Sequence, residues 1–159
     1  MGRFLALLAA LWGVPTVPAA EPPQAFAAVV HPSNTTRDIR LRDLSSLFEG
    51  ARRHWSNSLP VVLVERDSNS APYQYLMVHL LNTTAGEYKR HLQSIEYSGE
   101  AALSIKTLNS DAAACQFVFN VPTAIAIIET RSLGLAACGQ VQVLRIDGKL
   151  PAEEGYRLK

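Results

Sequence analysis

Residues 67–70 have the types and the spacing of an anion-binding turn. An apolar run over 61–64 leads through Arg66 into Asp67-Ser68-Asn69-Ser70, and a helical pattern follows. Serine hydroxyls and the unpaired N–H groups of a helix start can donate hydrogen bonds to a bound oxyanion. The same residue types cap helices in proteins that bind no anion. The chemistry therefore leaves two interpretations open, an oxyanion site and a plain helix cap.

A strand and a helix must position this turn. Residues 60–65 predict a buried parallel strand, because the run within them is apolar on both faces. The following helix is expected to open near Ser70, with Pro72 in its first turn. Its inward-facing side chains are expected to be Tyr75, Leu76, Val78 and Leu80.

The other apolar patterns alternate between strands and helices. Strands are predicted over 25–30, 103–108, 124–128 and 141–146, the last at an edge or with one solvated face. Helices are predicted from Leu41 to a stop at Gly50, from a capping box at Thr84 and Glu87 to 97–99, and from a cap at Asn109 or Ser110 toward Asn120. In the second of these helices Tyr88, His91, Leu92 and Ile95 share one face. Such alternation predicts an α/β fold, a layered and mostly parallel sheet flanked by helices.

Several segments resemble the substrate-binding proteins of phosphate ABC transporters. Asp67-Ser68-Asn69-Ser70 is similar to that family's Asp-Ser-Gly-Thr turn, and Tyr97-Ser98-Gly99 to its aromatic-Ser/Thr-Gly turn. Similar motifs lie at 29–34, 41–55, 120–125 and 146–151, so the resemblance covers most of residues 21–159. It implies a short, single-lobe member with one lobe of the type II periplasmic-binding-protein-like fold.

The resemblance also implies a function and a set of ligand-binding residues. It implies an exported binding protein, not an enzyme, that takes phosphate or a similar oxyanion and works with an ABC permease or another periplasmic protein. Ser68 and Ser70 would donate hydroxyl hydrogen bonds beside Asn69, and Arg66 would supply charge. The resemblance further implies that Asn34 and Ser98 reach in from neighbouring turns. Hydroxyl donors and a guanidinium suit a tetrahedral oxyanion.

Three departures from the family pattern keep an alternative open. Ala51 replaces a basic residue, Asn69 replaces the turn glycine, and Ala126-Ile127 replaces Gly-Tyr. Full members close two lobes around the ligand, whereas residues 21–159 cover little more than one. The alternative is a single-lobe periplasmic interaction or sensory module that has lost ligand binding.

The first twenty residues have the pattern of a cleaved secretory signal. Arg3 is followed by the apolar run 4–14 and by the small residues of 17–20. We expect a periplasmic or secreted protein whose domain occupies 21–159. The apolar run is too short to cross a bilayer, so we expect no membrane span after cleavage.

The net charge, the histidines and the cysteines narrow the classes of function and of site that the sequence allows. A formal net charge of +1 argues against nucleic-acid binding, and the four histidines are too scattered to predict a metal site or other cofactor. Cys115 and Cys138 are either a disulfide or two buried thiols. A loose basic cluster is either a solvated helix face or a rim that attracts anions toward residues 68–70. It consists of Arg37, Arg40, Arg42, Arg52, Arg53 and His54.

Overall fold

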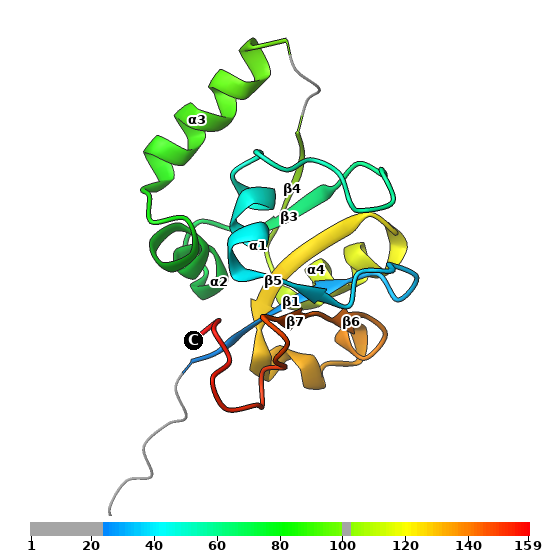
Figure 1. The fold of residues 1–159 in the computed structure, drawn as a ribbon. Coiled ribbons are helices and arrows are strands. Elements are labelled where there is room, and N and C mark those ends of the chain that lie inside the picture. Colours follow the sequence, from blue (N-terminus) through cyan, green and yellow to red (C-terminus); the bar gives the residue numbers. More distant parts are fainter. Residues whose placement is uncertain (1–23, 100–102) are drawn as a thin grey trace, which may run out of the picture.

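The computed structural model describes residues 24–99 and 103–159, so the predicted signal segment 1–20 lies outside the described residues. Within these described residues, seven strands form two sheets, and Figure 1 shows their arrangement. The strands are β1 (Phe26–Val30), β2 (Asp38–Ile39), β3 (Val62–Arg66), β4 (Ser104–Leu108), β5 (Ala124–Glu129), β6 (Gln142–Val143) and β7 (Arg145–Ile146). The helices are α1 (Leu41–Phe48), α2 (Ala71–Tyr75), the π-helix η1 (Leu76–Leu80), α3 (Ala85–Tyr97), α4 (Asp111–Asn120) and the short 3₁₀ turns η2 (Thr130–Gly134) and η3 (Ala136–Cys138).

The main sheet has five strands in the order β4-β3-β5-β1-β6, and β2 pairs with β7 beside it. β3 runs parallel to β4 and to β5, while β1 runs antiparallel to both of its neighbours. Two of the four strand pairings are parallel and two are antiparallel, so the sheet is mixed, and the predicted α/β class is confirmed. The carboxyl ends of β3, β4 and β5 lie at one edge of the sheet, and the carboxyl end of β1 lies at the opposite edge.

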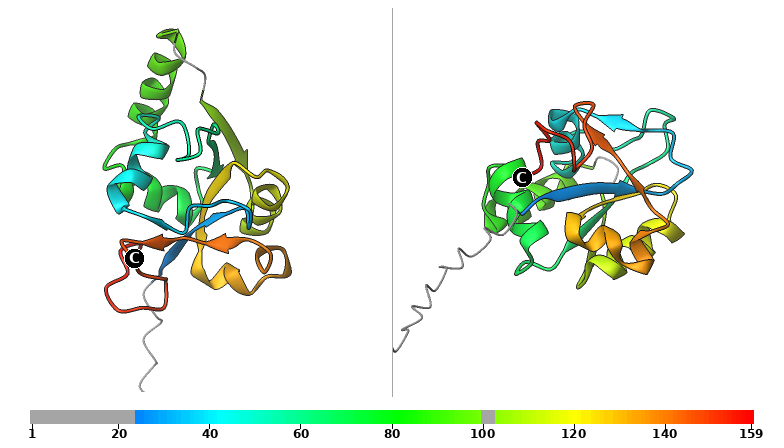
Figure 2. Two further views of the ribbon diagram at one scale, coloured as in Figure 1. Left: turned by 45° about the vertical axis from the view of Figure 1, so that its right-hand side comes forward. Right: turned by 90° about the horizontal axis from the view of Figure 1, so that it is seen from below.

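Helices cover both faces of this sheet (Figures 1 and 2). On one face Leu63 and Ile125 pack with the buried side chains of α1 and α2. On the other face Val64 and Ala126 pack with α4. Alternate residues of each strand thus enter two separate cores, which is why the central strands are apolar throughout.

The two cysteines form a disulfide between α4 and η3. Their Cα atoms lie 5.0 Å apart, and both side chains are buried in the core beneath α4. This resolves the open alternative in favour of pairing.

The helix after β3 departs from its predicted pattern. Tyr75 and Leu76 are buried as predicted, but Val78 is 55% exposed and Met77 is buried instead. The helix widens into the π-helix η1 after Tyr75, and the Leu81 N–H donates to the Leu76 carbonyl. This wider turn rotates the following side chains, so the prediction for Val78, which assumed an α-helical period, is wrong.

The predicted capping box at the start of α3 is present. Thr84 accepts a hydrogen bond from the Glu87 N–H, and the Glu87 carboxylate accepts one from the Thr84 N–H. α3 stands away from the sheet (Figure 1). Of its predicted inner face, Tyr88 is buried, Leu92 and Ile95 are half-buried, and His91 is exposed.

The predicted strand 141–146 is divided in two. β6 lies at the edge of the main sheet, as expected, whereas β7 leaves it to pair with β2. Leu144, between them, is fully buried.

Candidate functional site

The turn 67–70 joins the carboxyl end of β3 to the start of α2, as predicted. The Ser70 hydroxyl caps α2, because it accepts a hydrogen bond from the Tyr73 N–H at 3.3 Å. The same hydroxyl donates to the Asp67 carbonyl oxygen at 2.7 Å. The Ser68 carbonyl oxygen accepts from the Gln74 side chain at 2.6 Å. The hydroxyl of Ser70 is thus engaged within the turn, and its role there is that of a helix cap.

Ser68 and Asn69 lie at the tip of this turn and are exposed. Within the part of the chain that the structure describes, neither side chain makes a hydrogen bond. A hydroxyl and an amide group therefore face solvent at the carboxyl edge of the parallel strands. Ligands of open α/β sheets bind outside this edge.

The Arg66 side chain is largely shielded from solvent and forms a network of ion pairs and hydrogen bonds. Its side chain is 11% exposed, and its guanidinium pairs with the carboxylates of Asp111 and Asp67 and donates to the carbonyl oxygens of Leu108 and Asn109. Asp111, which is 6% exposed, also accepts from the Ser132 hydroxyl at 2.6 Å and from the Glu129 N–H at 3.1 Å. The pair ties together the ends of β3, β4 and β5.

Sequence reasoning missed Asp111. An acidic residue after Ser110 in the first turn of a helix is explained by capping and by the helix dipole alone. Its partner Arg66 lies 45 residues earlier, and no local pattern joins the two.

The structure does not bring Asn34 to this turn. Asn34 follows β1, and because β1 is antiparallel to β5, its end lies at the opposite edge of the sheet. Asn34 is buried, and its side-chain oxygen accepts from the Thr36 N–H at 2.9 Å.

Ser98 also lies elsewhere. It ends α3, is exposed, and donates to the Ile95 carbonyl oxygen at 2.7 Å. Figure 1 shows this end of α3 beyond the sheet, on the side where β4 begins. Of the six predicted ligand-binding residues, Arg66, Ser68, Asn69 and Ser70 are adjacent.

The predicted basic cluster surrounds α1 rather than the turn. Arg40 donates to Asp43 at 2.8 Å, Arg37 to the Asn34 carbonyl oxygen at 2.5 Å and Arg52 to the His54 carbonyl oxygen at 3.3 Å. None of these contacts involves residues 67–70.

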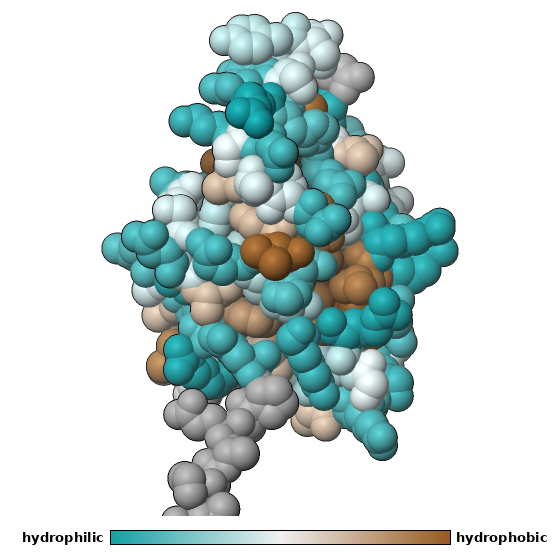
Figure 3. Space-filling model, turned by 90° about the vertical axis from the view of Figure 1, so that its left-hand side faces the viewer, coloured by the Kyte–Doolittle hydropathy of each residue, from teal (hydrophilic) through white to brown (hydrophobic). Residues whose placement is uncertain are grey.

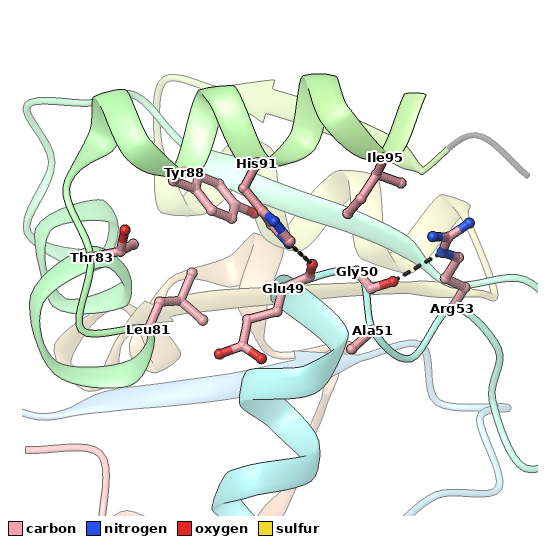
Figure 4. A pocket seen from close by; sticks show the side chains of 9 residues that line it. All are labelled: Glu49, Gly50, Ala51, Arg53, Leu81, Thr83, Tyr88, His91 and Ile95. Carbon is pink, nitrogen blue, oxygen red and sulfur yellow. Dashed lines mark hydrogen bonds between the residues drawn. The ribbon is translucent and has the colours of Figure 1, made fainter. Parts of the chain in front are cut away.

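A cavity of about 400 Å³ separates α3 from the end of α1 (Figure 4). Its apolar walls include Leu81 and Ile95, and at its rim His91 Nε2 lies 2.8 Å from the Glu49 carbonyl oxygen. Figure 3 shows apolar residues between hydrophilic side chains on the face of α2, η1 and α3. The cavity lies on the side of the sheet covered by α1, and no residue of the 67–70 turn lines it.

Tyr88 lines this cavity, and its hydroxyl contacts the buried carboxyl group of Glu65. The hydroxyl oxygen lies 2.7 Å from Glu65 Oε1 and 2.8 Å from the Phe48 carbonyl oxygen. Burial raises the pKa of Glu65, and the Tyr88 hydrogen bond opposes that rise in part. Burial and the nearby Glu65 also raise the pKa of Tyr88.

Neither a metal-binding cluster nor a membrane-spanning helix is found among the residues described. No cluster of three or more His, Cys, Asp and Glu side chains there could hold a metal ion. No helix in that part of the chain has the length and apolar character needed to span a bilayer.

Solved structures with a similar fold include proteins of phosphate transport. PstS from Borrelia burgdorferi has a TM-score of 0.66 and 14% identity, with 85% of this chain and 54% of that protein covered. A phosphate transport receptor from Vibrio cholerae has a TM-score of 0.62 and 17% identity over 85% and 53%. A candidate phosphate ABC transporter substrate-binding protein from Clostridium perfringens, solved with bound phosphate, has a TM-score of 0.62 and 16% identity over 80% and 47%.

The chain has the fold of phosphate substrate-binding proteins. It spans about half the length of these structures, which fits a single lobe. Neither a family model nor a curated protein matches its sequence.

Proposed function

We propose that this chain is an exported binding protein, not an enzyme, for phosphate or a similar oxyanion, and that it works with an ABC permease or another periplasmic protein. The observation that carries the proposal is the exposed tip, Ser68 and Asn69, at the carboxyl edge of the parallel strands. The likeness in fold to phosphate-binding proteins adds support. Ser70 and Arg66 hold the tip in place.

The tip would supply one side of a ligand shell. Enclosure on all sides gives such sites their affinity, so a ligand held from one side should bind weakly. We therefore expect a dissociation constant on the order of millimolar, lowered when a second protein surface covers the ligand. Asn34 and Ser98, at other places in the fold, would not contribute to this shell.

Thermal unfolding of phosphate-free protein at constant ionic strength tests the proposal. Phosphate at about ten times the dissociation constant should stabilise the native state by about 1.4 kcal/mol and raise Tm. Ser68→Ala should remove most of that rise. Because the Ser68 hydroxyl makes no hydrogen bond within the described residues, this variant should keep the Tm of the wild type without phosphate.

Ser56→Ala is the matched control, since Ser56 is also an exposed turn serine. It should respond to phosphate like the wild type. Ser70→Ala is less informative, because loss of the cap should cost about 1 kcal/mol with or without phosphate. If the Tm of the wild type does not change when phosphate is added, the proposal is contradicted.

A second candidate is a single-lobe interaction or sensory module without a ligand. The specific observation that favours it is the burial of Arg66 between two carboxylates, since Arg66, Asp67 and Asp111 together carry a net negative formal charge. A negative field at the turn opposes anion binding. Unchanged Tm at high phosphate, together with retained binding to a protein partner, would favour this candidate.

A further inference from the structure

Three arginine side chains line a hollow of about 500 Å³ at the start of α1. Arg40 and Arg42 come from the start of α1 and Arg157 from the end of the chain. Leu41 and Leu80 add apolar wall between them. The hollow therefore combines positive charge with an apolar surface.

Two of these guanidinium groups have unused donors. Arg42, 78% exposed, lies 3.8 Å from Asp43, and Arg157, 59% exposed, lies 4.0 Å from Asp147. Both distances exceed a hydrogen bond, and neither arginine donates one to any described residue. Each guanidinium keeps its planar set of N–H donors, which matches a carboxylate.

An adjoining hollow of about 390 Å³ shares Arg40 and adds Arg37 and Arg52. Together the two hollows hold five arginines and three aspartates, a net formal charge of +2, whereas the whole chain carries +1. No lysine lines either hollow. The hydrogen bond from Arg40, with the charges of Arg40, Arg42 and Arg52, lowers the pKa of Asp43.

We propose that the hollow at the start of α1 is an interaction site for an acidic segment of a partner protein. Carboxylates of that segment bind Arg42 and Arg157, and an apolar side chain beside them packs on Leu41 and Leu80. This site goes beyond the proposed oxyanion function, because no residue of the 67–70 turn lines the hollow.

A protein partner fits this surface better than a lipid bilayer. A flat membrane surface cannot enter a hollow, whereas the side chains of a peptide segment can. Protein interfaces are enriched in arginine and depleted in lysine, as this surface is. Bidentate pairing also gives arginine a geometric preference for carboxylates.

Fluorescence anisotropy with a short labelled peptide of alternating glutamate and leucine tests the site in phosphate-free buffer. We expect the wild type to bind the peptide, and Arg42→Glu and Arg157→Glu each to weaken binding about tenfold or more. Arg42→Lys should also weaken binding, because an ammonium keeps the charge but lacks the planar donors. The control is Arg131→Glu, which changes a 79% exposed arginine on η2 and should bind like the wild type.

Two results would overturn the proposal. The first is an equal loss in Arg131→Glu, which would mean that net charge alone attracts the peptide. The second is binding to vesicles that contain phosphatidylglycerol without binding to the peptide, which would identify a lipid surface. Ser68→Ala should leave peptide binding unchanged, so failure of the phosphate site and failure of this site are distinguishable.

Discussion

The Tyr88 hydroxyl contacts two oxygen atoms and has one proton to donate. The Tyr88 hydroxyl can donate to the Glu65 carboxylate or to the Phe48 carbonyl oxygen, and only a protonated Glu65 can donate to Tyr88 in return. Burial raises the pKa of Glu65, so the fold favours the protonated carboxyl group more than the unfolded chain does.

This arrangement predicts that stability falls as pH rises. The pKa of Glu65 is higher in the folded protein than its ordinary value of 4.5, so the native state binds more protons than the unfolded state between the two pKa values. Its contribution is complete below about pH 4.5 and is lost as pH rises through the folded pKa. Urea unfolding of the wild type and of Glu65→Gln measures the difference.

Glutamine can donate to Tyr88 at every pH, so Glu65→Gln should lack this part of the pH dependence. Glu96→Gln is the control, because Glu96 is exposed on α3. Parallel pH profiles for the wild type and Glu65→Gln would show that Glu65 is already ionised in the fold.

At the scale of elements, the sequence was sufficient to predict a contact wherever the two residues that make it are close together in the chain. Ser70 and Thr84 cap their helices as predicted, and Gly50 follows α1 with φ of +75°, a conformation that glycine adopts readily. The direction of β1 could not be predicted, because the apolar pattern of a strand is the same in both directions. Because β1 is antiparallel to its neighbours, Asn34, which follows β1, lies at the sheet edge opposite residues 67–70.

In the candidate site, too, contacts between residues close in sequence could be predicted and contacts between distant residues could not. The turn 67–70 was predicted because strand, turn and cap are consecutive in sequence. The pairing of Arg66 with Asp111 was not, since it depends on how β3 and α4 meet. The exposure of Val78 depends on the π-helical turn, for which the residues of 76–80 give no clear signal.

The disulfide gives a prediction about α4 and η3. Removing it in the double variant Cys115→Ala with Cys138→Ala should lower the free energy of unfolding by about 2–4 kcal/mol. Thermal unfolding with and without reductant measures this. Reductant should lower the Tm of the wild type and leave the double variant unchanged, and a wild type that is insensitive to reductant would contradict the prediction.

At the scale of the whole molecule, the predicted signal segment leads to a prediction about the start of the exported protein. The first described residues lie just before β1, which occupies an interior position in the sheet. We expect the exported protein to begin near Glu21, because the residues of 17–20 are small enough for cleavage. Intact-mass measurement of the exported protein checks this, and recovery of the full chain from Met1 in the membrane fraction would contradict it.

The interior position of β1 has a consequence for the order of folding. A ribosome makes β1 first, but its neighbour β5 comes almost a hundred residues later and β6 more than a hundred. The Phe26 N–H also donates to the carbonyl oxygen of Leu158 at 2.8 Å. The apolar strand β1 therefore stays exposed until nearly the whole chain has been synthesised and its neighbouring strands can pair with it. Such long-range pairing is slow to form and leaves the incomplete chain prone to aggregation. During its synthesis this protein should depend on chaperones that hold its first strand.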